Sequence, residues 1–312
     1  MKFAVDPWAP EYESSSDLAT LAPSDAVVDV NVEVSAQDWA PRAAAADPAK
    51  CTVFVDGVRR IDARVWIQDP DGASRLGICA SYAAGVTRCD SAARVDAVAV
   101  RRALFATARP SVDGVSAIAT RAGTFEPRTV ASDDVTALTM GLQQRMTELE
   151  VEVAASSEPA DLVVIDGPLR GSQHLDDAVG YVKTHHVAYL PAIVADSVVR
   201  LTPGERTPLF FMTTSWSRYS WYLRLPCQRT HDWAGVVRCE ASGELTQAQA
   251  VALAERATAT LPRFASSAYK DARAPQNLYP IAGLERELRR RLGDPALIQR
   301  MLRQAAAAAA AA

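Results

Sequence analysis

The chain has 312 residues, 49% of them hydrophobic, and a net charge of −4, which suits one large domain or two modest ones around a sizeable apolar core. No apolar run approaches the ~18 residues that a membrane span needs, and the N-terminus lacks the basic and apolar blocks of a signal peptide. Because the chain has neither a membrane span nor a signal peptide, we expect a cytoplasmic globular protein that binds no membrane. Its acidic balance gives no general attraction to nucleic acid.

Residues 1–48 are rich in Ala, Asp, Ser and Pro, which predicts an irregular leader that packs on the core, with one possible strand in AVVDVNVEV. From Cys51 onward, β-branched runs predict consecutive antiparallel strands in CTVFVDGV, RIDARVWIQD and LGICASYAAGV. Asp56 and Gly57 are expected to turn the chain between the first two, because Asp-Gly is a common hairpin signal. A further strand is expected in DAVAVRRALF.

A long helix is expected next, and Ser132 or Asp133 can cap its N-terminus. Glu158 and Pro159 mark the break after it, and the apolar run DLVVID then predicts a strand buried on both faces that ends in Asp166. Apolar residues at helical spacing form one stripe along the helix, namely Leu138, Leu142, Met146, Leu149 and Val153.

The second half of the chain adds more strands and helices. RTPLFFMTT, RYSWYLRLP and WAGVVRCEA predict a second group of strands, and AVGYVKTHHVAYL is typical of mixed strand and loop. LTQAQAVALAERATATL predicts a helix with a threonine cap. PIAGLERELRRRLGDPALIQRMLRQ predicts one or two helices, which the alanine tail can extend.

The order of three antiparallel strands, a helix and a buried strand is similar to that of the ribonuclease H-like architecture. The fold class that we predict is therefore α/β, with a ribonuclease H-like mixed sheet flanked by helices and with additional β and C-terminal helical elements. The predicted organisation is a leader over residues 1–48, a core over 49–304 and an alanine-rich tail over 305–312.

Two aspartates end apolar runs and precede glycine, Asp56 in VFVDG and Asp166 in VVIDG. Converging carboxylates repel one another unless a cation neutralises them, and Mg²⁺ and Mn²⁺ prefer oxygen ligands. The helix supplies a third acid: Glu150 flanks the apolar stripe, with Glu148 as the second choice. We therefore predict a site for Mn²⁺ or Mg²⁺ that supports phosphodiester hydrolysis by two metal ions. The alternatives are two Asp-Gly turns and solvated helix glutamates.

The segments FVDGVRR, RMTELEVEV, LVVIDGPLRG, GYVKTHH, WAGVVRCE and APQNLYPIAGLE occur in the order seen in NurA-domain nucleases. The chain resembles this family over about residues 50–300. The resemblance implies a ribonuclease H-like fold, a DNase that acts on DNA ends and single strands with Mn²⁺ or Mg²⁺, and a homodimer. It also implies a partner of the HerA type, a hexameric ATPase that translocates DNA.

The resemblance also implies roles for individual residues. Asp56, Glu150 and Asp166 match the family's acids, and Lys183 matches a lysine that contacts the scissile phosphate or stabilises developing charge. Members of the family usually place a His or Asp on the helix after the YP element, whereas this chain offers Glu285 and Glu287. Either Glu285 replaces that residue as a metal ligand, or the second metal ion is held poorly. The predicted DNA contacts are Arg170, His185, Arg273, Gln276 and Asn277.

Other readings remain open. A degenerate nuclease domain could guide DNA for the translocase without cutting it, and related folds in sugar kinases and actin-like ATPases also place Asp-Gly near nucleotide phosphates. No P-loop or GxSxG motif is present, and the five cysteines form no CxxC pair. The aromatic run around Trp216 and Trp221 could stack bases, but core packing is the plainer interpretation.

Overall fold

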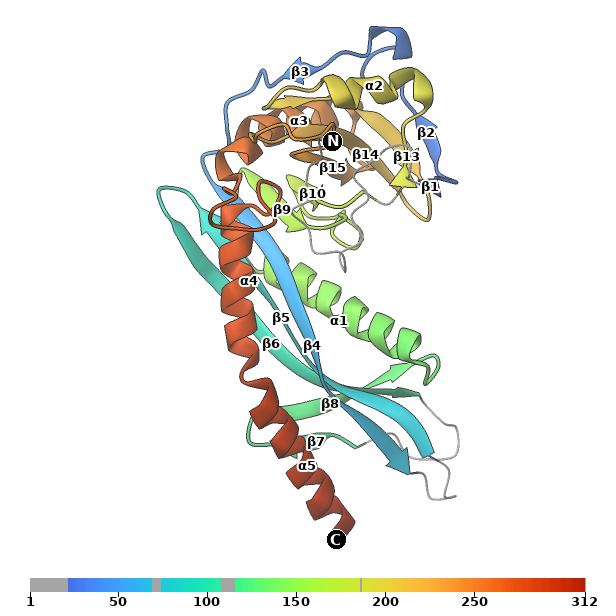
Figure 1. The fold of residues 1–312 in the computed structure, drawn as a ribbon, viewed down its shortest axis with the longest axis vertical. Helices are drawn as coiled ribbons and strands as arrows, with labels where there is room; N and C mark the ends of the chain where they lie inside the picture. Colours follow the sequence, from blue (N-terminus) through green and yellow to red (C-terminus); the bar gives the residue numbers. More distant parts are fainter. Residues whose placement is uncertain (1–21, 69–73, 108–115, 186, 312) are drawn as a thin grey trace, which may run out of the picture. The chain divides into compact units, whose positions relative to one another are not determined.

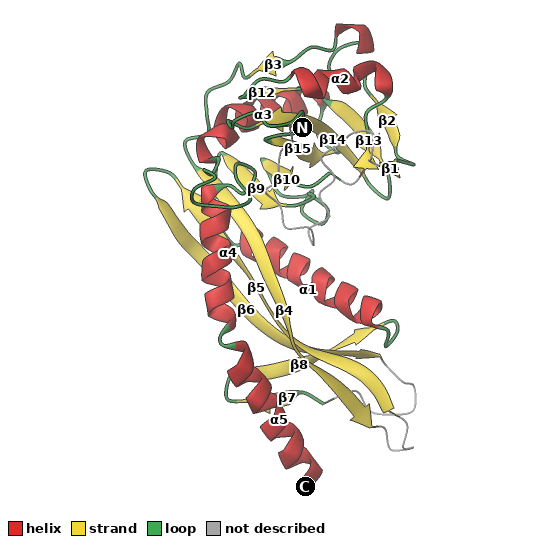
Figure 2. Ribbon diagram, in the orientation of Figure 1, coloured by secondary structure: helices red, strands yellow, loops and turns green. Residues whose placement is uncertain are grey.

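The computed structural model describes residues 22–68, 74–107, 116–185 and 187–311. The chain is α/β, with a large mixed sheet flanked by helices (Figure 1, Figure 2). It divides into two compact units, which are described separately below. The first comprises Met1–Val55, Thr87–Arg94 and Glu158–Gly283, and the second comprises Asp56–Val86, Val95–Ser157 and Leu284–Ala312.

The sheet of the first unit centres on β9 (Leu162–Asp166), which lies parallel to β10 (Ala178–Val182) and to the first four residues of β4 (Thr52–Gln68). Val and Ile dominate this parallel region, as expected for strands covered on both faces. The sheet continues from β10 through antiparallel neighbours, in the order β15 (Val236–Ser242), β14 (Ser217–Arg224), β13 (Phe210–Thr213) and β2 (Val27–Asp29).

Short elements complete the first unit. A helical turn, η3, spans Ala36–Asp38. Two strand pairs are β1 (Ala22–Pro23) with β11 (Val187–Ala188), and β3 (Arg42–Ala43) with β12 (Glu205–Arg206), which also pairs with β14.

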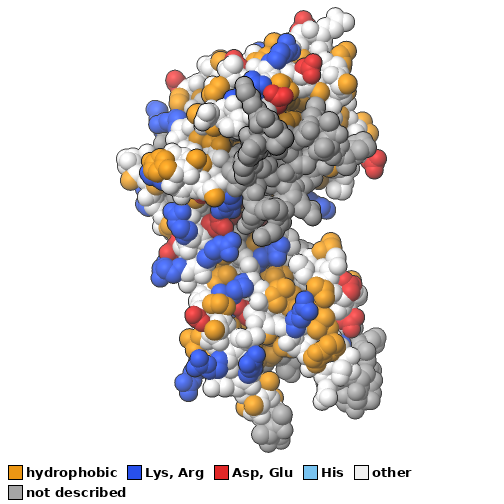
Figure 3. All heavy atoms as spheres, viewed as in Figure 1, with side chains coloured by type: hydrophobic (Ala, Val, Ile, Leu, Met, Phe, Trp, Pro, Cys, Tyr) orange, Lys and Arg blue, Asp and Glu red, His pale blue; other side chains and the backbone are white. Residues whose placement is uncertain are grey.

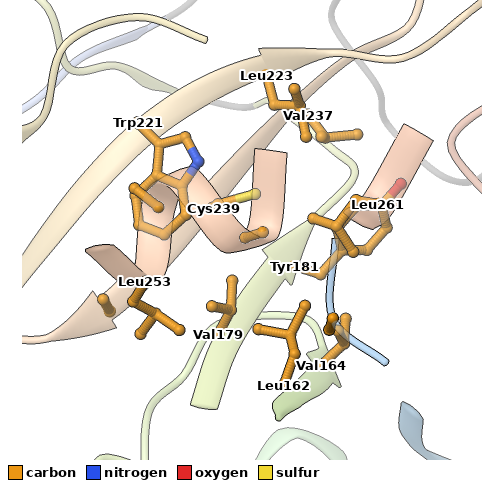
Figure 4. Packing of buried hydrophobic residues seen from close by; sticks show 14 of the residues in the cluster. Leu162, Val164, Val179, Tyr181, Trp221, Leu223, Val237, Cys239, Leu253 and Leu261 are labelled. Carbon is orange, nitrogen blue, oxygen red and sulfur yellow. The ribbon is translucent and has the colours of Figure 1, made fainter. Parts of the chain in front are cut away.

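Two helices cover opposite faces of this sheet. Cys239 and its odd-numbered neighbours on β15 face α3 (Gln247–Thr260), which continues into η4 (Leu261–Phe264). Val236, on the other face of the same strand, packs with α2 (Ala192–Arg200). The core on the α3 side includes Tyr181 and Trp221, both fully buried (Figure 4). The site described below lies at the ends of β9 and β10, beside this core.

The second unit is built on the rest of β4 together with β5 (Ser74–Cys89) and β6 (Ala93–Thr107), which are consecutive neighbours in the sheet. The connection from β5 to β6 is too short for a crossover, so the two strands run antiparallel. Beyond β6, β8 (Gly123–Val130) lies parallel to it and pairs antiparallel with β7 (Ile118–Thr120).

Helices cover both faces of this second sheet as well. Gly57 faces α1 (Val135–Ala155), where Met146 and Glu150 lie against it. Val58 points to the opposite face and packs on α4 (Tyr279–Leu292), and further along the sheet Cys79 packs on α5 (Pro295–Ala311). The apolar stripe predicted for the long helix is therefore confirmed: all five of its residues are buried.

The predicted turn at Asp56 and Gly57 is wrong, because the first two expected strands form the single strand β4 of 17 residues. The N-cap of α1 also differs from expectation: Asp134, and neither Ser132 nor Asp133, accepts a hydrogen bond from the backbone N–H of Ala137 at 2.8 Å. The threonine cap of α3 is confirmed, since Thr246 and Gln249 form a reciprocal capping box. Strands were predicted in DAVAVRRALF and WAGVVRCEA, and β6 and β15 confirm them.

Charged side chains of both signs lie on the face of the molecule that Figure 3 shows. On the face shown in Figure 3, Lys and Arg are interspersed with acidic, polar and apolar side chains. On α4, Arg289 contacts Glu285 and Arg290 contacts Glu287. Within the described residues, no helix is long and apolar enough to cross a membrane.

Candidate functional site

Asp166 is the last residue of β9 and lies at the end of the parallel region of the first unit. Its Oδ2 accepts a hydrogen bond from Lys183 Nζ at 2.6 Å, and both side chains are largely buried. The other oxygen, Oδ1, is shielded from solvent and has no hydrogen-bond partner within the described part of the chain. Because a buried carboxylate oxygen without a donor is costly, this atom is the first sign of a ligand site.

Lys183 extends the contact toward a loop between α3 and α4. Its Nζ lies 3.4 Å from Asn277 Oδ1, a long hydrogen bond, and the Asn277 amide donates to Asp271 Oδ2 at 2.7 Å. Asp271 Oδ1 accepts from the backbone N–H of Arg273 at 2.8 Å. Asp166, Lys183, Asn277 and Asp271 thus form one chain of polar contacts, which we call the Asp166 network.

The backbone around Asp166 holds this network in place. Gly167 has a φ of +105°, which an L side chain rarely adopts, and its N–H donates to Tyr181 O at 2.9 Å. The Tyr181 hydroxyl donates to Gln276 O at 2.7 Å and so ties the loop to β10. Burial raises the pKa of Tyr181 well above its ordinary value, so this hydroxyl stays protonated and remains a donor at neutral pH.

A second pair of acids lies in the second unit, on either side of Gly57. Asp56 Oδ1 accepts a hydrogen bond from the Gly57 N–H at 2.7 Å. A Cβ atom added to Gly57 would lie 2.5 Å from Glu150 Oε1, so the glycine leaves the space that this carboxylate fills. Asp56 and Glu150 are each only 7% exposed. Side chains alternate between the two faces of a strand, so Asp56 points to the face opposite the one on which Glu150 packs against Gly57.

Asp56 and Asp166 each follow the last residue of the paired region of β4 and β9. In the first unit, the last pair between the parallel strands β4 and β9 is Val55 with Ile165. The next residue of each strand is an aspartate, Asp56 and Asp166. The boundary between the units falls after Val55, so the structure describes Asp166 with Lys183 and, separately, Asp56 with Glu150.

The oxygen donors fit a hard divalent cation better than a soft one, since they are carboxylates without a neighbouring thiol ligand. The unpartnered Oδ1 of Asp166 is an available ligand atom, whereas Lys183 already occupies Oδ2. Among the residues that the structure describes, no group of three or more His, Cys, Asp or Glu side chains is arranged to hold a metal ion. The argument for a divalent cation at this site therefore rests on the Oδ1 atom of Asp166 alone.

Other predicted site residues lie elsewhere. Glu285 is on α4 and bonds to Arg289 at 2.8 Å. Glu148, the alternative helix acid, is exposed and contacts Arg145 at 2.6 Å, whereas Glu150 is buried. Of the two glutamates, only Glu150 therefore has the buried position expected of a site residue.

The residues predicted to contact DNA are spread over the first unit. Arg170 is exposed in the turn after β9. His185 is buried against Trp233, and its Nε2 lies 3.1 Å from Val236 O, which favours a structural role. Gln276 and Asn277 are buried inside the loop, and Arg273 is half-buried beside Asp271. Only Arg170 among these five has a freely exposed side chain.

Two polar contacts of the first unit could not be predicted from the sequence, those of Asp271 and Arg218. Asp271 lies in the loop KDARAPQNLYP, but a lone acid in a polar loop carries little signal. Arg218 and Arg238 both contact Glu240 Oε1, at 2.9 and 2.8 Å, and no sequence pattern predicts the Arg218 contact. Trp221 and Tyr222 are buried, which confirms the core-packing interpretation for these two residues, whereas Trp216 is half-buried.

Comparison with known proteins does not place the chain in a family. No family model matches it, and no curated protein matches it. The fold and the site thus define an α/β protein with a buried aspartate–lysine pair at the end of a central parallel strand. A functional conclusion must rest on that geometry.

Proposed function

We propose that the chain is a metal-dependent DNA nuclease that hydrolyses phosphodiester bonds at DNA ends and in single strands. The observation that carries the proposal is the Asp166 carboxylate, with one oxygen bound to the Lys183 ammonium and the other buried without a partner. An oxygen of this kind suits a cation, and an ammonium beside it suits a phosphate. Phosphodiester hydrolysis needs both.

In the proposed reaction, Asp166 is a ligand of Mn²⁺ or Mg²⁺, and Lys183 contacts the scissile phosphate. When bound, such cations activate a water molecule and neutralise charge on the leaving oxygen. Asn277 positions the Lys183 ammonium through the contact at 3.4 Å, and Asp271 in turn orients the Asn277 amide. Lys183 stabilises the negative charge that develops on the phosphate as water attacks.

Asp56 and Glu150 are the further acids of the proposal. Both are buried: Asp56 accepts a hydrogen bond from the Gly57 N–H, and Glu150 fills the space where a Gly57 side chain would lie. Asp56 is included because, like Asp166, it follows an apolar run and precedes a glycine in the sequence. The ribonuclease H-like core, the NurA resemblance, the homodimer and a HerA-type translocase belong to the same proposal and are supported by the order of the sequence motifs.

A non-catalytic adaptor that guides DNA for such a translocase is the second candidate. The observation that favours the adaptor is that two possible metal ligands already pair with cationic side chains of the protein. Lys183 occupies one oxygen of Asp166, and Arg289 contacts Glu285, the residue expected to replace a C-terminal ligand. An adaptor would keep the DNA-binding surface and the fold but would not need a metal ion.

Cleavage of end-labelled single- and double-stranded DNA in Mn²⁺, Mg²⁺ or EDTA tests the nuclease. We expect metal-dependent cleavage that is lost in Asp166→Asn, Asp56→Asn and Glu150→Gln. Matched controls are Asp176→Asn and Glu152→Gln, which change two exposed acids, and these variants should cut normally. Circular dichroism would first establish that every variant is folded.

Calorimetric titration with Mn²⁺ gives a readout that does not depend on turnover. Mn²⁺ should bind the wild type and Asp176→Asn, and Asp166→Asn should bind it at least about ten-fold more weakly, the loss typical of a perturbed metal site. Absence of cleavage in the wild type, with or without a translocase, would favour the adaptor. Normal cleavage by folded Asp166→Asn would show that Asp166 is not a ligand.

A further inference from the structure

The loop that carries the Asp166 network also presents two tyrosine rings and a lysine. Tyr269 is 81% exposed, and Tyr279, the first residue of α4, is 37% exposed. The Lys270 ammonium lies 5.3 Å from the centre of each ring. The three residues therefore form a compact surface with two aromatic faces and one positive charge, which we call the tyrosine cradle.

Hydrogen bonds fix one side of the cradle. The Tyr279 hydroxyl donates to Ser267 Oγ at 2.8 Å and accepts from the Ser267 N–H at 3.2 Å. The Lys270 N–H donates to Ser267 O at 2.8 Å, so Ser267 anchors both residues. Tyr269, in contrast, extends most of its ring into solvent. An anchored ring and an exposed ring that share one cation are unlike the packed aromatic residues of the core.

The chemistry of the cradle matches an unpaired nucleotide. Every base has an apolar face that stacks on an exposed aromatic ring, whereas in a duplex both faces are covered by neighbouring bases. A lysine beside the ring can neutralise the phosphate of the same nucleotide. The hydrogen bond and the electrostatic influence of Tyr269, together with that of Tyr279, raise the pKa of Lys270, so its positive charge is retained at neutral pH.

The cradle is continuous with the Asp166 network along the chain. Lys270 immediately precedes Asp271, and Tyr279 follows Asn277 by two residues. The Asn277 amide donates a hydrogen bond to Asp271 Oδ2 at 2.7 Å, and Asn277 Oδ1 lies 3.4 Å from Lys183 Nζ. From these observations we infer that Tyr269, Lys270 and Tyr279 bind an unpaired base of single-stranded DNA. This inference rests on the proposed function and specifies a single-stranded substrate for it.

Fluorescence anisotropy with labelled oligothymidine in EDTA tests the inference, because EDTA prevents cleavage while binding is measured. Tyr269→Ala should weaken binding by about five-fold to about a hundred-fold, the range measured for the loss of one stacked base. Tyr269→Trp should restore it. Trp66→Ala, which removes an exposed aromatic residue of the second unit, should bind like the wild type.

An abasic oligonucleotide and a blunt duplex distinguish base stacking from contacts with the DNA backbone. Abasic nucleotides in the oligonucleotide should weaken binding to the wild type but not to Tyr269→Ala, and a blunt duplex should bind both proteins equally. The inference is overturned if the wild type does not bind oligothymidine, if Tyr269→Ala binds it normally, or if the variant loses duplex binding to the same extent. Tighter binding of the matching RNA would overturn DNA as the ligand.

The cleavage assay separates this inference from the proposed nuclease. Asp166→Asn should lose cleavage, whereas Tyr269→Ala should weaken the binding of oligothymidine in EDTA. If the wild type cuts DNA and Tyr269→Ala binds normally, the nuclease stands and the cradle is refuted. If binding depends on Tyr269 but the wild type never cuts, the cradle stands and the chain is the adaptor.

Discussion

Gly57 and Gly167 each follow an aspartate, but the chain needs them for different reasons. Gly167 has a φ of +105°, and no atom lies within 4 Å of the position where its Cβ would be. It is needed for its backbone conformation, which turns the chain after β9. Gly57 lies inside the extended strand β4 and is needed because Glu150 and Met146 fill the space of a side chain.

Gly57→Ala should therefore destabilise the protein by overpacking. A Cβ at this position would lie 2.5 Å from Glu150 Oε1 and 2.9 Å from Met146 Cγ, so both side chains must shift. We expect a loss of about 1–3 kcal/mol in the free energy of unfolding, measured by urea denaturation. Gly283→Ala is the control: it adds a Cβ in open space on a helix and should stabilise by about 1 kcal/mol.

The position of Glu150 could be predicted from the sequence, because a helix stripe fixes which residues face the sheet. The position of Asp166 at the end of a strand could be predicted as well, from the apolar run that precedes it. Asp271 could not be predicted, because its contact with Asn277 depends on a loop without periodicity. The burial of His185 and Gln276 could not be predicted either, because it depends on neighbours that are distant in sequence.

At the level of elements, strands and helices with strong patterns were predictable, and their lengths were not. Asp-Gly usually predicts a turn, but Asp56 and Gly57 lie between β-branched runs that continue as one strand of 17 residues. Pairing with neighbouring strands and the packing of α1 on Gly57 override the local turn preference. Local propensity contributes too little free energy to compete with such burial.

The N-terminus of α3 gives a prediction for a single element. Thr246 accepts from the Gln249 N–H, and the Gln249 side chain accepts from the Thr246 N–H at 2.9 Å. Thr246→Ala removes one of these bonds and should cost about 1 kcal/mol of stability. Gln247→Ala, an exposed neighbour, should change stability by less than about 0.5 kcal/mol. Equal unfolding midpoints for the two variants would contradict the role of the cap.

At the level of the whole molecule, several buried acidic groups link stability to pH. Burial raises the pKa of Cys79 to about 12, with a contribution from the nearby Asp62, and burial also raises that of Tyr222 to about 12. In the unfolded chain these groups lose their protons near their ordinary values, 9.0 and 10.0. The folded protein retains them, so its stability is complete below about pH 9 and declines as the pH rises.

Urea denaturation between about pH 8.5 and 11 measures this decline. Each fully shifted group contributes a slope of about 1.4 kcal/mol per pH unit once its unfolded form has titrated. Cys79→Ala removes one of them and should give a shallower slope than the wild type above about pH 9. Parallel slopes for the two proteins would show that Cys79 is not a source of the pH dependence.

The contact between Lys183 and Asp166, at 2.6 Å, has a consequence for how a cation would arrive. The ammonium acts as an internal counterion of the carboxylate before any metal ion is present. A divalent cation that uses Oδ2 as well as Oδ1 would have to exchange with this ammonium. Metal uptake and the release of Lys183 toward the DNA would then be a single coupled event.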